Sequence, residues 1–409
     1  MTMRISTSSI YSASATQMGT LQSQLARTQQ QLSTQRRMLS AADDPIASAR
    51  ALEVTQSQSI NTQFATNRAN ARAALAQEET VLTGVGSLIQ DMQSIGVAAG
   101  NGIISASDRA SYATQLQGQL DDLLSLANSS DGNGGYMFAG FKSTTVPFVQ
   151  TVNGVRYDGD QGQVQLQVAS SRKVATGDPG SSVFAGLPTG NGTFTTSPGG
   201  ANTGTGTISV GTVSSPQLVT GHSYSIDFSV AGTPAVTQYQ VNDTSNGTST
   251  PVGLPATYTP GASITVAGMT FEVNGAPADT DSFAVEPSMK QSLFDTVSQM
   301  IATLRAPANT AAEKKALSDG VTQANRNLSG ALDNVLSVRA SVGTRMKEFD
   351  TLDSVGEDTN IQYAATLSKL QDLDLIQAYS QFTQQQATLE AAQKTFKSVS
   401  GLSLFNFIS

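Results

Sequence analysis

The chain has 409 residues, of which 13% are charged and 38% apolar, and its formal net charge is −8. An acidic chain of this composition is a poor partner for nucleic acid. It contains no cysteine, which excludes disulfides, thiol catalysis and thiolate metal sites. No apolar run reaches the ~18 residues of a membrane-spanning helix, and the N-terminus lacks the apolar core of a Sec signal peptide. We therefore expect no membrane partner, and an extracellular role would require another export route.

Basic residues are distributed unevenly along the chain. The first 40 residues contain no acid and carry Arg4, Arg27, Arg36 and Arg37. Residues 174–289 contain no Lys or Arg. The basic N-terminal segment fits either a solvated helix face or a packing surface between subunits, and the sequence favours neither.

The N-terminal segment has the residue spacing of a coiled-coil helix, which is predicted to end near Ala42. Its seam positions are Tyr11, Ser14, Met18, Leu21, Leu25, Thr28, Leu32, Gln35 and Leu39. Asp44 suits the N-cap, and Pro45 the first position, of a second helix that runs to about Ala99. The second helix has a distal seam at Val81, Val85, Leu88, Met92 and Ile95. Asn101-Gly102 ends it, and a third helix is predicted from about Ser107 to Ala127.

The composition changes near Ser129, and residues 140–288 are predicted to form a β domain. The sequence Val152-Asn153-Gly154-Val155 is a strong signal for a two-residue hairpin. Short alternating segments follow, separated by Gly, Pro, Thr and Ser clusters. Their apolar positions are Val164, Leu166 and Val168, then Tyr224, Ile226, Phe228 and Val230, and finally Phe271 and Val273.

Helix is predicted to resume at Met289 and to break at Pro307. A further helix follows, and the last helix carries a seven-residue repeat at Leu375, Phe382, Leu389 and Phe396. The fold class is therefore mainly α with an inserted β domain, with long helical coiled-coil arms from both termini packed antiparallel. Each arm has a single, partly polar stripe, so its burial offsets little of the entropy lost on ordering. We expect the arms, at about residues 1–40 and 370–409, to be disordered in an isolated monomer and to need neighbouring subunits.

Candidate sites for chemistry are weak. His222 is the only histidine, which excludes a His-based metal cluster and a Ser-His-Asp triad. Residues 170–173 match S-x-x-K without its companion motifs. Residues 158–162 suggest a calcium loop, but the spacing does not continue to the required Glu, so a tight turn is favoured. The glycines of residues 132–135 lack nucleotide-loop spacing. The sequence thus predicts no catalytic residue, no metal, no cofactor and no enzyme.

Several segments resemble one known family. Residues 32–45 (LSTQRRMLSAADDP) resemble the flagellin-family N-terminal signature, although flagellins proper usually read D-D-A-A-G where this chain has D-D-P. Residues 135–142 (GYMFAGFK) resemble an F-A-G motif, and residues 155–160 (VRYDGD) a Y-x-G-D element, of the family's junction-forming members. Residues 341–345 and 402–405 resemble its C-terminal half. The resemblance covers both arms and the start of the β domain, whereas residues from about 185 to 285 match loosely.

This resemblance implies a flagellin-like rod and a structural subunit of the bacterial flagellum that joins hook to filament by polymerising through its terminal helices. It implies an inner coiled-coil arm domain (1–44 and 365–409), a helical rod domain (45–139 and 289–364) and an inserted outer β domain (140–288). The expected assembly seam is Leu21, Leu25, Leu32, Leu39, Leu375, Phe382, Leu389, Phe396, Leu404 and Phe405.

The implied partners are copies of the chain itself, a hook-associated protein on the hook side, flagellin on the filament side and a flagellar export chaperone. The implied location is extracellular, reached through the flagellar type III secretion apparatus without a cleaved signal peptide. Flagellin itself is the nearest alternative function, disfavoured by the D-D-P sequence and the F-A-G and Y-x-G-D elements. A secreted adhesin or effector and an enzyme are more distant alternatives.

Overall fold

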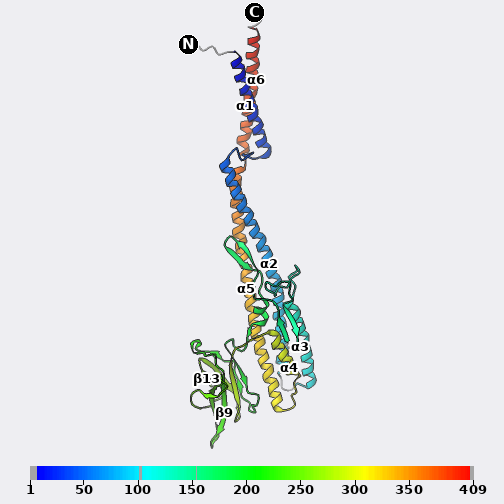
Figure 1. The fold of residues 1–409 in the computed structure, drawn as a ribbon, viewed down its shortest axis with the longest axis vertical. Coiled ribbons are helices and arrows are strands. Elements are labelled where there is room, and N and C mark those ends of the chain that lie inside the picture. The colour runs from blue at the N-terminus through cyan, green and yellow to red at the C-terminus, as the bar shows by residue number, and fades with distance from the viewer. Residues whose placement is uncertain (1–6, 101–103, 153, 406–409) are drawn as a thin grey trace. The chain divides into compact units, whose positions relative to one another are not determined.

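A computed structural model describes residues 7–100, 104–152 and 154–405 (Figure 1). The chain divides into two compact units, one formed by residues 1–66 with 351–409, and the other by residues 67–350. Two helices, α2 (Pro45–Ala99) and α5 (Ala311–Gln371), contribute to both units. The three-domain boundaries expected from the sequence remain a prediction. No helix among the described residues is long and apolar enough to cross a membrane.

The terminal unit contains helices α1 (Thr7–Thr34) and α6 (Leu375–Phe405), which lie side by side (Figure 1). They are antiparallel. The ring of Tyr11 meets that of Phe396 edge-on at 5.7 Å near one end. At the other end the Arg37 N–H donates to the carbonyl of Gln371 at 2.8 Å. The predicted antiparallel arms and the mainly α class are confirmed.

The prediction that the first helix extends to Ala42 is wrong, because α1 ends at Thr34. Gln35 has a φ of 55°, in the left-handed region, which stops the helix. The Asp43 carboxylate then accepts the N–H groups of Leu39 and Ser40 at 2.8 and 3.0 Å, which stabilises a loop. Leu39 therefore follows the helix instead of continuing its seam.

The start of α2 agrees with the sequence. The helix begins at Pro45, and Asp44 Oδ1 accepts the N–H of Ala47 at 3.0 Å as an N-cap. It ends at Ala99, as predicted.

The helical part of the central unit is formed by α2, α5, α3 (Ala106–Ala127) and α4 (Leu293–Arg305), with α3 and α4 adjacent (Figure 1). The predicted positions Val85, Met92 and Ile95 are buried on α2, together with Leu82 and Ile89. The prediction that helix resumes at Met289 is wrong, since α4 begins at Leu293. Ser292 caps that helix by accepting the N–H of Asp295 at 3.0 Å. The residues before it form a strand instead.

Two hairpins lead into the β structure. The first pairs β1 (Phe148–Thr151) with β2 (Gly154–Tyr157), and Thr151 lies opposite Gly154, as the hairpin signal predicted. The second pairs β3 (Gln165–Ala169) with β4 (Arg172–Ala175). A short pair, β5 (Leu187–Pro188) with β16 (Lys290–Gln291), closes the inserted region just before α4.

The rest of the insertion is a sandwich of two sheets, in which every described pairing is antiparallel. The first sheet has the order β11-β10-β9-β15-β6, with β12 also pairing with β10. Its strands are β6 (Phe194–Pro198), β9 (Tyr224–Ala231), β10 (Val236–Asp243), β11 (Thr250–Pro251), β12 (Ala256–Thr257) and β15 (Ser282–Pro287). The second has the order β13-β14-β7, with β8 also pairing with β14. Its strands are β7 (Thr207–Ile208), β8 (Thr212–Val213), β13 (Ser263–Val266) and β14 (Met269–Asn274).

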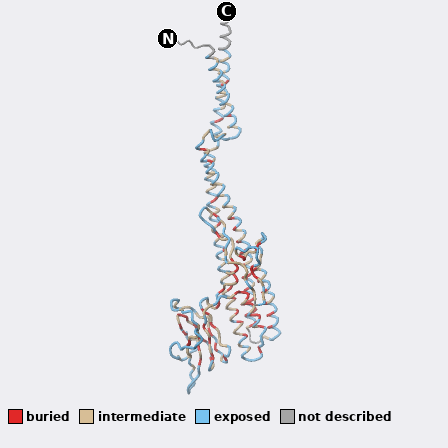
Figure 2. The backbone as a smooth tube through the Cα atoms, in the orientation of Figure 1, coloured by how far each residue is buried: buried red, intermediate tan, exposed pale blue. Residues whose placement is uncertain are grey.

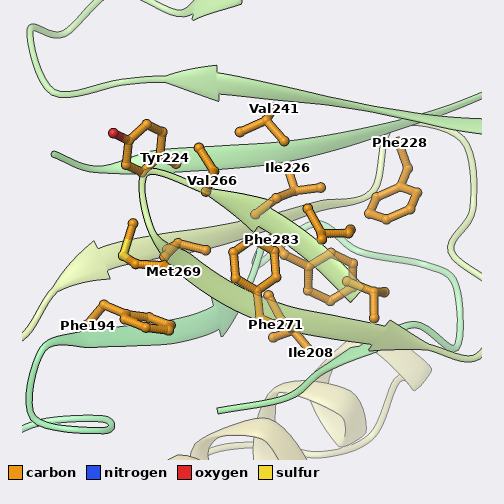
Figure 3. Close-up of a cluster of buried hydrophobic side chains, with 13 residues drawn as sticks. Phe194, Ile208, Tyr224, Ile226, Phe228, Val241, Val266, Met269, Phe271 and Phe283 are labelled. Atoms are coloured by element: carbon orange, nitrogen blue, oxygen red, sulfur yellow. The ribbon is translucent and has the colours of Figure 1, made fainter. Parts of the chain in front are cut away.

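Side chains from both sheets meet in one apolar core (Figure 3). Alternate residues point inward from Tyr224 to Phe228 in β9 and from Met269 to Val273 in β14, which confirms the predicted alternation there. Val230, the last position predicted in β9, is exposed instead. The phenyl rings of Phe228 and Phe283 pack edge-on at 5.7 Å. The buried members are Phe194, Ile208, Tyr224, Ile226, Phe228, Val241, Ile264, Val266, Met269, Phe271, Val273, Phe283 and Val285.

Candidate assembly surface

The seam between α1 and α6 is narrow and partly polar. Thr28 is buried, and its hydroxyl lies 2.9 Å from Gln385 Oε1 on α6. Figure 2 shows few buried residues along these two helices. On α6 the buried or half-buried positions are Ala378, Phe382, Gln385, Leu389, Ala392 and Phe396. Their spacing of four and three residues is that of a heptad seam, so α6 presents one continuous face to α1.

The structure places the predicted seam residues differently along the pair. Leu21, Leu25 and Leu32 are half-buried on α1, and Leu39 is half-buried in the loop that follows. On α6, Phe382 and Phe396 are half-buried and Leu389 is 9% exposed. Leu375, at the first position of α6, is 48% exposed. Leu404 and Phe405 lie in the last turn of α6, outside the residues whose side chains the structure describes.

A joint at residues 35–44 and 372–374 connects the two arms to α2 and α5. Arg36 and Asp372 form an antiparallel bridge, and the N–H of Leu373 donates to the carbonyl of Gln35 at 3.1 Å. Asp43 receives an ion pair from Arg27 at 2.7 Å. The N–H groups of Ser40 and Leu39 hold the pKa of Asp43 below its usual range. Both chain segments are thus held by hydrogen bonds where the helices break.

Several large apolar side chains of the terminal unit are exposed. We call Ile46, Leu52, Ile361, Ile376 and Tyr379 the outer apolar residues, since each is at least 67% exposed. Exposed apolar side chains of this size are unfavourable in water, and concentrations of them usually mark protein interfaces. The sequence analysis missed them because they lie outside the seam spacing.

The F-A-G and Y-x-G-D elements form a structural clasp in the central unit. The Tyr157 hydroxyl lies 2.9 Å from the carbonyl of Phe138, and Asp160 Oδ1 accepts the N–H of Phe141 at 2.9 Å. The Phe141 N–H is the main reason that the pKa of Asp160 is held below its usual range. Gly140 has a φ of 72°, and a β-carbon there would clash with Asp160. The motif residues therefore fix the backbone of this segment.

The residues weighed for chemistry make ordinary structural contacts. In the calcium-like segment, Asp158 pairs with Arg156 at 2.6 Å, and Asp160 belongs to the clasp. Arg172, within the S-x-x-K match, pairs with Glu348 at 2.5 Å. His222 Nδ1 lies 2.6 Å from Asp243 at the surface of the sandwich. Among the described residues, no group of three or more His, Cys, Asp or Glu is placed to hold a metal ion.

A buried charged group in the central unit was missed by the sequence analysis. Glu78 of α2 is 2% exposed, and its Oε1 accepts the N–H of Asp178 at 3.1 Å. Asp178 pairs with Arg345 of α5. The pKa of Glu78 is raised to about 8. Burial is the main cause and the nearby Asp178 carboxylate the second, whereas Arg345 opposes the shift. Because Glu78, Asp178 and Arg345 lie far apart in the chain, no local pattern in the sequence indicates that they meet. Arg345 is also the last residue of the segment 341–345, whose resemblance to the family was noted above.

Comparison with known proteins agrees with this arrangement. A family model described as Bacterial flagellin N-terminal helical region matches residues 5–143. Flagellar hook-associated protein 3 of Salmonella typhimurium is 31% identical over 404 residues, which cover 98% of this chain and 99% of that protein. The protein of the same name from Escherichia coli is 30% identical over 404 residues, with the same coverage.

Two solved structures are also similar. The flagellar junction protein FlgL from Legionella pneumophila is 32% identical with a TM-score of 0.69, and the match covers 79% of this chain and all of that one (100%). FlgL from Xanthomonas campestris is 31% identical with a TM-score of 0.67, and the match covers 77% and 99% of the two chains. Paired terminal helices around an inserted β sandwich thus define a flagellin-like protein. The chain belongs to the flagellar hook-associated protein 3 family, whose members are structural proteins of the flagellum.

Proposed function

We propose that this chain is a structural subunit of the bacterial flagellum that joins the hook to the filament. The observation that carries the proposal is the similarity to flagellar hook-associated protein 3 along 98% of the chain, with both terminal helices included. That similarity also favours the junction function over filament flagellin. A relative of this family is described as a flagellar junction protein, and its fold matches this one.

The subunit polymerises through its terminal helices. The seam residues Leu21, Leu25, Leu32, Phe382, Leu389 and Phe396 hold the two arms together, and the half-buried ones also contact neighbouring copies. Leu39, Leu375, Leu404 and Phe405 extend this surface. The outer apolar residues supply the second contact face, because their side chains have no cover within the terminal unit. Assembly removes both sets from water, which supplies the free energy that the narrow seam lacks.

A junction requires two unlike interfaces on one subunit. We assign the hook-side interface to another hook-associated protein and the filament-side interface to flagellin, with copies of this chain at the sides. An export chaperone covers the α6 seam before assembly, in the way that a groove accepts an amphipathic helix. Export through the flagellar type III secretion apparatus, without cleavage of a signal peptide, delivers the chain outside the cell.

Immunogold labelling of isolated flagella tests the proposal. We expect a narrow band of label where the hook meets the filament. Label along the whole filament would instead indicate flagellin, and absence of label from flagella would indicate a secreted adhesin or effector.

A matched pair of variants tests the second contact face. Ile376→Ser with Tyr379→Ser removes two outer apolar side chains, which are 85% and 68% exposed, and should abolish filament attachment. Gln384→Ser with Gln386→Ser changes two exposed polar residues of the same helix and should leave attachment intact. Normal filaments on the first variant would exclude these residues from the interface.

A further inference from the structure

A pocket lies at the end of the helical part of the central unit where α3 and α5 begin (Figure 1). It has a volume of about 360 Å³, and its apolar wall includes Ile104 and Leu317. Its charged and hydroxyl side chains are Arg109 of α3 and Lys314 and Ser318 of α5. Among the described residues, the lining therefore contains two cationic side chains and no carboxylate.

The guanidinium of Arg109 is buried but has no partner. Arg109 is 9% exposed, and its Nε is closed off from solvent without a hydrogen bond. Neither terminal nitrogen makes a hydrogen bond or an ion pair within the part of the chain that the structure describes. These two nitrogens, unlike Nε, are not closed off, so they are the donors that a ligand in the pocket can reach. A buried charge without a partner is strongly unfavourable, so its presence at a pocket points to an anionic ligand.

The charge at this pocket is not balanced by the acids closest to it in the sequence. Asp108 accepts the N–H and the hydroxyl of Ser105 at 3.2 and 2.7 Å, as part of the cap of α3. Glu313 accepts two backbone N–H groups at the start of α5, at 2.7 and 2.9 Å, and Asp319 pairs with Lys315 at 2.8 Å. The C-terminal end of α2 carries about half a negative charge, which offsets only part of two full cations. A ligand with two negative charges is therefore favoured.

We propose that this pocket binds a phosphate group in its doubly charged form. The phosphate oxygens accept hydrogen bonds from the terminal nitrogens of Arg109 and pair with the Lys314 ammonium, with the Ser318 hydroxyl as a further donor. A guanidinium offers two parallel N–H donors that match two oxygens of a phosphate. A carboxylate is less suitable, because it neutralises only one of the two cations. The phosphate is either inorganic phosphate or the phosphate group of an organic ester, and the site stands independently of the assembly proposal.

Calorimetric titration of the full chain with sodium phosphate tests the site, at pH 8 in a chloride buffer of constant ionic strength. At this pH phosphate groups are mainly doubly charged. We expect saturable binding at one site per chain, and at least tenfold weaker binding of acetate. Phosphate should also raise the midpoint of thermal unfolding of the central unit, because a ligand that binds only the folded chain stabilises it.

Three variants sharpen the test. Arg109→Met keeps an unbranched side chain without the charge, and it should weaken phosphate binding at least tenfold. The same variant should unfold at a higher temperature than the wild type when phosphate is absent, because an unpaired buried charge has been removed. Lys314→Met changes an exposed residue and should weaken binding by a smaller factor, about threefold to tenfold. Lys369→Met removes the same charge from an exposed position elsewhere on α5 and should bind like the wild type.

Three results would overturn the proposal: no saturable binding of phosphate, equal binding by the wild type and Arg109→Met, or binding of acetate as tight as that of phosphate. The last result would indicate a carboxylate ligand instead, such as an acidic side chain of a second copy. If Arg109→Met does not fold, as judged by circular dichroism, equal binding by Lys314→Met and Lys369→Met overturns the proposal in its place.

Methyl phosphate distinguishes the two sources of the phosphate group. Methyl phosphate binding at least as tight as that of inorganic phosphate supports an organic ester, because the pocket then accepts the added methyl group. Weaker binding of methyl phosphate supports inorganic phosphate.

Discussion

The arms of the terminal unit and the sandwich of the central unit both bury apolar residues, but in very different ways. The sandwich closes a core in which Ile226, Phe283 and Val285 have no exposed surface at all. The seam of the arms includes Ser14, Thr28 and Gln385, and Leu389 is the one large apolar residue that is buried among the described side chains of α6. Two sheets can cover both faces of a core, whereas two helices can cover only one stripe on each other.

From this difference we expect the sandwich to fold on its own and the order of the arms to depend on partners. The sandwich encloses aromatic side chains from both sheets, and such burial is the main favourable contribution to folding. The arms leave Ile376 and Tyr379 of α6 in water and bury few large side chains. The physical properties of the arms therefore match a role in assembly, and those of the sandwich match independent stability.

The largest expected effect comes from disrupting the α6 seam. Phe382→Ser with Leu389→Ser should abolish junction formation and weaken chaperone binding, because the neighbouring subunits and the export chaperone are proposed to cover the same apolar face of α6. The thermal unfolding of the central unit should be almost unchanged, since these residues lie outside it. Motility, electron microscopy of hook ends and calorimetry give the three readouts, with Gln384→Ser plus Gln386→Ser as the control. Loss of central stability together with normal chaperone binding would show that the seam is a monomer core.

Within the central unit, Phe283→Ala should lower the stability that the α6 seam variant leaves almost unchanged. Phe283 has 0% exposure, so its truncation leaves a cavity and should lower the free energy of unfolding by about 3–5 kcal/mol. Tyr379→Ala, at a position that is 68% exposed, should change the free energy of unfolding by less than about 0.5 kcal/mol. Urea unfolding monitored by circular dichroism measures both changes. Similar losses for the two variants would remove the distinction between sandwich and arms.

The pH dependence of central stability should depend on Glu78. Its pKa is raised from 4.5 to about 8 in the folded chain, so the neutral carboxyl favours folding. That contribution is complete below pH 4.5 and is lost as the pH rises through about 8. Glu78→Gln should flatten this dependence. At pH 9 its free energy of unfolding, measured with urea, should exceed that of the wild type by roughly 2–4 kcal/mol. Parallel pH profiles for the two proteins in an amine-free buffer would contradict the assignment.

The smallest effect on assembly is expected from removing the sandwich. Replacement of residues 185–285 by a short Gly-Ser linker should leave motility at least partly intact, because the seam and the outer apolar residues lie elsewhere in the chain. Swimming on soft agar and secretion of the variant are measured together. Normal secretion with complete loss of filaments would show that the sandwich makes an essential contact.

Local signals in the sequence determined most of the element pattern. Asp44 and Pro45 predicted the start of α2, and the alternation in β9 and β14 predicted the side chains that enter the core, except that Val230 of β9 is exposed. The hairpin at residues 151–154 followed from its turn residues. These predictions succeeded because capping, turn geometry and side-chain periodicity act between residues that are close in the chain.

Contacts between distant residues decided the rest. Helix α1 ends at Thr34, where the loop that follows it bonds to Gln371 and Leu373, and α4 begins only at Leu293, after Lys290 and Gln291 pair with β5. The same holds for the sites. Heptad spacing identified the seam, but only the fold exposes Ile376 and Tyr379 and brings Glu78, Asp178 and Arg345 together. Burial and ion pairing across the chain depend on which surfaces meet, and no local spacing in a sequence specifies that.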